Sequence, residues 1–222
     1  FLADTLPAHV GITARLMAAR IRSLVEQARF FDHSWLVDEG LVHLDRFSAM
    51  FGVYGLAECV DALVALDGGT GRYGADADAI ALGWRIVERV AELVAETPMP
   101  YCEGNGGHAF LHSQSGIDSD LGVTAGTRIP IGTEPPLPQH LAAVTPNHRW
   151  FASGVSDILH FDDTATRNPQ ACVDVVRGAL ATGMRDVTFN LDSNDFIRIT
   201  GYLVRKSDLR KLEESGVARH GS

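Results

Sequence analysis

A strand–helix–strand pattern in the C-terminal third of the chain constrains its fold more than any other feature. Residues 155–161 and residues 187–191 are short apolar segments that predict two strands. Between them, Asn168 and Pro169 predict the start of a helix, with Asn as the N-cap and Pro in the first turn, and Gly183 predicts its end. Two strands joined by a helix predict a βαβ unit with a parallel strand pair, and therefore an α/β fold.

Helical periodicity is clearest in residues 78–96. Apolar side chains recur on one face of this segment, and Asp76 and Asp78 place negative charge at its start, where the helix dipole favours it. Further helices are predicted over residues 8–31, 55–63, 139–144 and 207–214. Residues 47–54 fit a short strand or a bend, and residues 101–115 fit a glycine-rich extended segment.

The composition predicts one globular domain that spans residues 1–222. Hydrophobic residues make up 45% of the chain and charged residues 21%, which is typical of a folded protein. The net charge is −9, from 19 basic and 28 acidic residues, and the basic residues form no run, so we expect no nucleic-acid partner. No apolar run reaches the roughly 18 residues of a membrane span, so we expect no membrane partner.

The three cysteines, Cys59, Cys102 and Cys172, are far apart and form no C-x-x-C pair. An odd number of cysteines without a signal-peptide pattern predicts reduced thiols and a cytoplasmic location. The chain begins at Phe1 without a methionine and ends shortly after a charged helix, so we expect a piece of a longer protein, truncated at both ends.

One glycine near the C-terminus lies within an apolar segment that reads Arg198-Ile199-Thr200-Gly201-Tyr202. This sequence resembles the radical-bearing loop of glycyl radical enzymes. Loss of a Cα hydrogen leaves a planar radical that is delocalised into the flanking amide groups, and glycine has no side chain to oppose that geometry. A motif this short also fits a glycine in a turn or bulge between strands.

Other segments extend the resemblance over nearly the whole chain. Residues 47–58, which read FSAMFGVYGLAE, are similar to a stretch of the anaerobic (class III) ribonucleotide reductases, and residues 128–132 and 151–154 follow in the same order. Together with residues 111–118, they identify the chain as similar to the YjjI-type family of glycyl radical enzymes, which is related to those reductases and to pyruvate formate-lyase. The resemblance implies the C-terminal half of a ten-stranded α/β barrel, with the radical loop at about residues 194–206.

The resemblance also implies an activity and its partners. Gly201 would store a backbone radical, held in place by Arg198 and Tyr202, for hydrogen abstraction from a small-molecule substrate under anaerobic conditions. The radical itself needs no bound cofactor, because a separate radical SAM activating enzyme with S-adenosylmethionine and an iron–sulfur cluster installs it. A homodimer is expected. The thiyl cysteine of the family is expected upstream of Phe1, and the absence of a C-x-x-C pair argues against ribonucleotide reduction.

Cys102 and Glu103 place a thiol beside a carboxylate in a glycine-rich segment. Glycyl radical lyases place a glutamate two residues after their thiyl cysteine, whereas the spacing here is one. A buried structural thiol is the preferred interpretation of Cys102, and the lining of an active site is the alternative for both residues.

Two other functions remain open at this point. A non-catalytic module could dock on a damaged partner and supply a fresh glycine loop. A metal-dependent hydrolase could use His108, His112 and Asp118, because the two histidines are four residues apart and an aspartate follows. Scattered polar side chains in a connecting segment explain the same residues, and no metal site is assigned.

Overall fold

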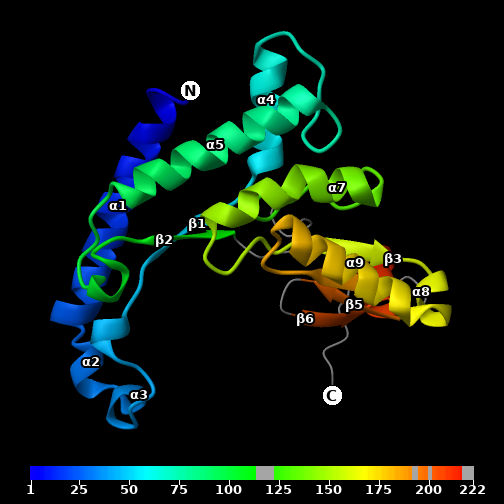
Figure 1. Cartoon of the computed structure of the whole chain (residues 1–222). Helices are drawn as coiled ribbons and strands as arrows, with labels where there is room; N and C mark the ends of the chain where they lie inside the picture. Colours follow the sequence, from blue (N-terminus) through cyan, green and yellow to red (C-terminus); the bar gives the residue numbers. More distant parts are fainter. Residues whose placement is uncertain (114–122, 192–194, 200–201, 217–222) are drawn as a thin grey trace.

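The computed structural model describes residues 1–113, 123–191, 195–199 and 202–216. These residues form an arch of helices and short strands (Figure 1). Three strand pairs occur in the described part of the chain: β1 (Met50–Val53) with β2 (Phe110–Ser113), β3 (Ile158–Phe161) with β4 (Thr188–Leu191), and β5 (Phe196–Ile199) with β6 (Tyr202–Arg205). The first two pairs are parallel and the third is antiparallel. The fold is therefore a mixture of helices and strands of the α/β kind.

The N-terminal arm of the arch consists of helices. The predicted helix over residues 8–31 is α1 (Thr5–Arg22), which continues as a π-helical segment (Ser23–Gln27) and ends there. Arg29 then adopts a left-handed conformation with φ of 49°, which breaks the helix before two short helices, α2 (Phe30–His33) and α3 (Trp35–Asp38). Figure 1 shows α2 and α3 at the free end of this arm.

Two helices connect the first parallel strand pair. These are α4 (Leu56–Leu66) and α5 (Ala77–Ala95), and Figure 1 shows them along the outer edge of the arch with β1 and β2 on its inner side. The predicted start of α5 is confirmed, because the Asp76 carboxylate accepts hydrogen bonds from the backbone N–H groups of Asp78 and Ala79. The buried side of α5 supplies Ile86, Val87 and Val94 to the core.

The predicted βαβ unit is present. Strand β3 is followed by α8 (Thr164–Arg167) and α9 (Pro169–Thr182) and then by β4, which pairs with β3 in parallel. Pro169 is the first residue of α9, and Gly183 ends it with φ of 111°, both as predicted. Asn168 occupies the predicted N-cap position of α9. The predicted capping by its side chain is wrong, because the side chain makes no capping hydrogen bond.

The segment predicted to be extended, residues 101–115, has mixed structure. A 3-10 turn spans Glu103–Asn105, and of the described residues 101–113 only Phe110–Ser113 form a strand. Glycine-rich sequence favours turns as much as extended backbone, and here Gly106 and Gly107 adopt positive φ between the two elements. The remaining predicted helices are α7 (Leu137–Val144) and α10 (Lys206–Ser215), and α7 is followed by a 3-10 segment, η4 (Thr145–Trp150).

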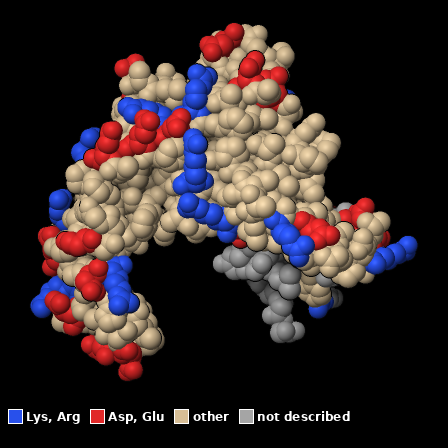
Figure 2. Space-filling view, in the orientation of Figure 1, with Lys and Arg blue, Asp and Glu red and all other residues tan. Residues whose placement is uncertain are grey.

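Charge is mixed over the surface. In Figure 2, Lys and Arg side chains run in a broken line down the centre of the visible face, with Asp and Glu side chains beside them. The same view shows that the arch is hollow between its two arms. Within the described residues, no helix is both long and apolar enough to cross a membrane.

Candidate functional site

The predicted radical segment lies at a β-hairpin. Strands β5 and β6 pair in a register that sets Ile199 opposite Tyr202 and Arg198 opposite Leu203. Arg198 is thus a residue of β5, and Tyr202 is the first residue of β6. Gly201, with the residue before it, connects the two strands and lies outside the described residues.

The open end of this hairpin is closed by hydrogen bonds. The Asp195 carbonyl accepts the backbone N–H of Lys206 at 2.6 Å. The Asp195 carboxylate accepts the backbone N–H of Ser207 at 3.1 Å with Oδ1 and the Ser207 hydroxyl at 3.0 Å with Oδ2. Asp195, the residue before β5, is therefore bound to the first turn of α10, and its negative charge faces the N-terminus of that helix.

A stacked pair reinforces the same end of the hairpin. The Arg205 guanidinium lies over the Phe196 ring, 5.2 Å from its centroid, and the two residues are opposite each other in the register. Lys206 additionally donates from Nζ to the Leu191 carbonyl at 3.4 Å, which links the hairpin to the end of β4. The β5–β6 hairpin is consequently held at its base, beside the βαβ unit.

Cys102 lies in the other arm of the arch. Its side chain is completely buried, and the 3-10 turn that follows it packs against the turn Leu44–Arg46 near α3. Burial raises the pKa of the Cys102 thiol, although a backbone hydrogen bond with Ala49 opposes this, so the thiol stays protonated at neutral pH. Glu103 is exposed on the turn. These contacts fit a packed thiol, and the role of either residue in an active site stays a prediction.

The two histidines of the hydrolase alternative are held by separate elements. His108 donates from Nδ1 to the Thr97 carbonyl at 3.3 Å, whereas His112 is a residue of β2 opposite Gly52. Asp118 lies outside the described residues. Among the residues that are described, no three His, Cys, Asp or Glu side chains are grouped to hold a metal ion.

A buried hydrogen bond between a histidine and an aspartate was not predicted from the sequence. His140 on α7 donates from Nε2 to Oδ2 of Asp157, just before β3, at 2.6 Å, and the two side chains are 4% and 3% exposed. Burial by itself lowers the pKa of His140, but the hydrogen bond and charge of Asp157 outweigh it and raise the pKa above its ordinary value. The residues are 17 apart in the sequence, and no local pattern signals their contact.

A second buried histidine has a different role. His148 accepts with Nδ1 from the backbone N–H groups of Val155, at 3.3 Å, and Arg185, at 3.0 Å. Because Nδ1 accepts, the ring proton lies on Nε2, and the ring is neutral. Burial lowers the pKa of His148, which keeps it in this neutral form. The ring thereby ties the segment before β3 to the segment before β4.

Tyr73 is the centre of a third buried polar group. Its hydroxyl donates to the Thr127 carbonyl at 2.9 Å and accepts from the Asn147 amide at 3.2 Å, while its backbone N–H donates to Asp61 at 2.8 Å. Burial raises the pKa of Tyr73, so the phenol remains neutral. These bonds join the loop before α5 to η4.

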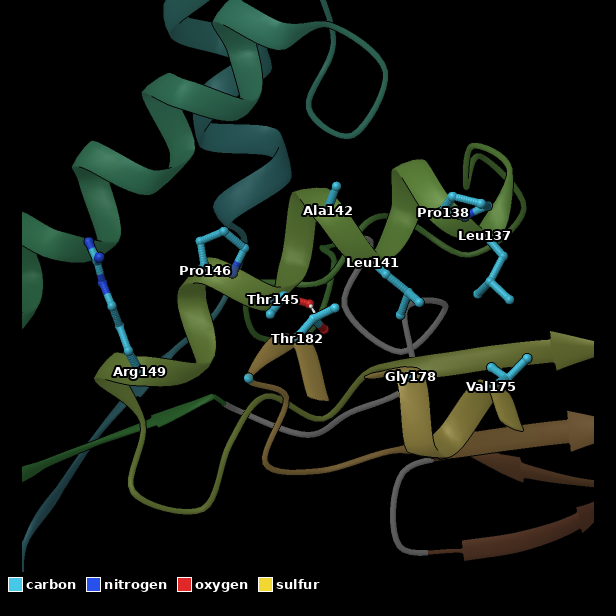
Figure 3. Close-up of a pocket in the computed structure, with 11 residues that line it drawn as sticks. Leu137, Pro138, Leu141, Ala142, Thr145, Pro146, Arg149, Val175, Gly178 and Thr182 are labelled. Atoms are coloured by element: carbon cyan, nitrogen blue, oxygen red, sulfur yellow. Dashed lines mark hydrogen bonds between the residues drawn. The ribbon is translucent and has the colours of Figure 1, made fainter. Parts of the chain in front are cut away.

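An apolar groove of about 700 Å³ lies between α7, η4 and α9. Figure 3 shows Leu141 and Pro146 on one side of the groove and Val175 and Gly178 on the other. Its one charged lining residue, Arg149, is engaged with Glu88 at 3.3 Å and lies over the Trp150 ring at 4.6 Å. The groove therefore offers packing surface but no acid, base or nucleophile.

The chain is similar to known proteins over its whole length. Residues 1–222 match the model of the family described as glycyl radical enzyme YjjI-like. The uncharacterized protein YjjI of Escherichia coli (strain K12) is 47% identical over 216 residues, which are 97% of this chain and 42% of that protein. An uncharacterized protein of Haemophilus influenzae is 32% identical over 220 residues, 98% of this chain and 43% of that protein. The chain thus spans less than half the length of these relatives.

Solved structures share the fold. An anaerobic ribonucleotide reductase matches 98% of this chain and 40% of its own, with a TM-score of 0.67 and 13% identity. The anaerobic ribonucleotide reductase of Thermotoga maritima in complex with dATP and CTP matches 93% of this chain and 39% of its own, with a TM-score of 0.65 and 14% identity. At this identity the likeness concerns the fold alone. The family model, which covers every residue, shows that the chain belongs to the YjjI-like glycyl radical enzymes.

Proposed function

We propose that this chain is the C-terminal, radical-bearing portion of a glycyl radical enzyme and that Gly201 stores the unpaired electron. The observation that carries the proposal is the family match over residues 1–222. The position of Gly201 between the paired strands β5 and β6 supports it, because the family's radical glycine lies on a loop and this residue connects two strands. The reaction would be hydrogen abstraction from a small molecule under anaerobic conditions.

The fold supports the proposal that this portion completes a barrel. The arch places β1 and β2 on its inner side and α4 and α5 on its outer side, the arrangement of strands and helices in an α/β barrel (Figure 1). We propose that the rest of a longer chain supplies the remaining strands of a ten-stranded barrel and encloses the glycine. Enclosure would keep oxygen and water from the radical.

The thiyl cysteine would also come from the rest of the longer chain. Cys102 is buried in the N-terminal arm, and Cys59 and Cys172 are half-buried on helices α4 and α9. Burial raises the pKa of Cys59 as well, which is ordinary for a thiol packed in a helix interface. A thiol elsewhere in the enzyme would give its hydrogen atom to the Gly201 radical, and the resulting thiyl radical would abstract a hydrogen atom from the substrate.

A separate activating enzyme would install the radical. It would use S-adenosylmethionine and an iron–sulfur cluster to remove one Cα hydrogen from Gly201, and this chain would bind no cofactor for the radical itself. The β5–β6 hairpin would have to reach the activating enzyme, and its base contacts at Asp195 and Ser207 define the unit that moves. A cytoplasmic homodimer is part of the same proposal.

Air exposure tests the proposed radical position. After anaerobic treatment with the cognate activating enzyme, exposure to oxygen should cleave the backbone at residue 201, and mass spectrometry should find a chain that ends there. The variant Gly201→Ala should stay intact under the same treatment. Cleavage at another residue, or equal cleavage in Gly201→Ala, would contradict the proposal.

A further inference from the structure

A smaller cavity of about 380 Å³ lies between the segment before α7, α7 itself and β3. Its walls are partly apolar, with contributions from Ile131, Leu137 and Ile158, and three titratable side chains line it, namely Glu134, His140 and His160. None of its lining residues belongs to β5 or β6, and it shares Leu137 of α7 with the apolar groove of Figure 3.

His140 lines this cavity and uses only one of its two ring nitrogens in a hydrogen bond to a described residue. Nε2 is occupied, since its hydrogen is donated to Asp157, and a carboxylate can only accept. Asp157 is itself fixed, because its Oδ1 accepts the backbone N–H of Ile158 at 2.9 Å. In the neutral ring the lone pair is therefore on Nδ1, which makes no hydrogen bond to a described residue.

The surroundings of Nδ1 decide which ligand suits it. The His140 residue is only 3% exposed, so a group bound at Nδ1 would be shielded from bulk water. Glu134 accepts the backbone N–H of Gly132 with Oε2 at 2.6 Å, and its charge is close enough to His140 to contribute to the raised pKa of the ring. Negative charge at Glu134 and Asp157 disfavours an anionic ligand. Both Nδ1 and a carboxylate oxygen accept hydrogen bonds from hydroxyl groups.

We propose that this cavity, called the His140 pocket, binds a small neutral molecule that carries hydroxyl groups on an apolar body. One hydroxyl would donate to Nδ1 of His140 and a second to Glu134, while Ile131, Leu137 and Ile158 would contact the apolar part. When His140 is protonated, the same Nδ1 would donate to the hydroxyl oxygen, so the pocket retains the ligand in both states. This site does not depend on Gly201 or on a radical.

Histidine-selective NMR of the 222-residue chain tests the pocket with hexane-1,2-diol as the probe. Titration of the ¹⁵N-histidine-labelled protein should shift the Nδ1 signal of His140 saturably. The Nδ1 signal of His148 is the internal control, since this ring is buried but does not line the pocket. Hexanoate, which has the same carbon number and a negative charge, should leave His140 unshifted. The His140 signal is assigned by its loss in His140→Gln.

Glu134→Gln provides the matched variant, because it keeps the shape of the side chain and removes the charge. Diol binding should weaken by about tenfold, as expected for the loss of one charge-assisted hydrogen bond, and hexanoate should begin to bind. The control Glu213→Gln, on the exposed last turn of α10, should change neither affinity. An unchanged His148 signal shows that each variant is folded. The proposal is overturned if the diol shifts both histidines without saturation, if hexanoate binds the unmodified chain as well as the diol does, or if Glu134→Gln binds the diol with unchanged affinity.

Discussion

Asp195 and Ser207 are joined by two hydrogen bonds, so that the residue before β5 is held against the first turn of α10. This contact closes the base of the β5–β6 hairpin, whose two strands flank the proposed radical glycine in the sequence. A hairpin of two four-residue strands has little stability by itself, so closure of its base determines how often the hairpin opens.

Asp195→Ala should therefore loosen the hairpin without unfolding the rest of the chain. Loss of two exposed hydrogen bonds should lower the local stability by about 1–2 kcal/mol, since each is worth about 0.5–1.5 kcal/mol. Amide hydrogen exchange should become roughly tenfold faster in β5 and β6 and stay unchanged in α5. Glu213→Ala, on the exposed end of the same helix, should leave exchange in the hairpin unchanged. If the amide exchange rates in β5 and β6 were the same in Asp195→Ala and in the unmodified chain, the contact between Asp195 and Ser207 would not restrain the hairpin.

Gly83→Ala should destabilise the fold. A Cβ at this position would lie 2.5 Å from Cε2 of Tyr73, whose ring is buried and fixed by hydrogen bonds at its hydroxyl. Overpacking of this kind costs about 1–3 kcal/mol, and urea denaturation should show the corresponding loss in the free energy of unfolding.

The matched control for that variant is Gly178→Ala on α9, where no atom lies within 4 Å of an added Cβ. The helix propensity of alanine should make this variant more stable by about 0.5–1 kcal/mol. A stable Gly83→Ala would mean that Tyr73 can move aside, in contradiction to its fixed position.

The His140–Asp157 pair should make stability depend on pH. The pKa of His140 is raised in the folded protein, so its contribution is complete below the unfolded-state pKa of about 6.5 and is lost as the pH rises through the folded-state pKa. The difference in the free energy of unfolding between the unmodified chain and Asp157→Asn should be largest at about pH 5 and should shrink toward about pH 9. A difference that is constant with pH would indicate that His140 is not charged in the folded state.

His148 should behave in the opposite way. Its pKa is lowered by burial, so its contribution is complete above the unfolded-state pKa and is lost as the pH falls. His148→Ala should cost about 2–4 kcal/mol, because it leaves the buried N–H of Val155 and the partly buried N–H of Arg185 without an acceptor. His148→Asn, whose Oδ1 can take the place of Nδ1, should recover much of this loss in urea denaturation. Equal losses in both variants would mean that the acceptor atom does not matter.

The fold could be predicted from the sequence where the signals are local. Pro169 and Gly183 bound α9, because residue type limits backbone geometry at these positions. Asp76 lies at the start of α5, where its negative charge is expected. The π-helical end of the first helix and the turn at Glu103–Asn105 were missed, because glycine-rich and polar sequence is compatible with several backbone conformations. The side chain of Asn168 does not cap α9, although its residue type favours capping.

The buried polar residues could not be predicted, because each depends on contacts between distant segments. His140 contacts Asp157 across 17 residues, and Tyr73 contacts Asn147 across 74. The contacts of His148 could not be predicted for the same reason, because its partners Val155 and Arg185 precede two different strands. For the site itself, the motif around Gly201 indicated the family, which the comparison over residues 1–222 confirms, while the role of Gly201 stays a prediction.

Anaerobic electron paramagnetic resonance of the enzyme after activation tests that role most directly. A radical on a glycine Cα couples to its one remaining α-hydrogen, so the predicted spectrum is a doublet that collapses to a single line when the protein is made with α-deuterated glycine, and that is absent in Gly201→Ala. A doublet that persists in Gly201→Ala, or one that keeps its splitting with deuterated glycine, would place the radical on another residue.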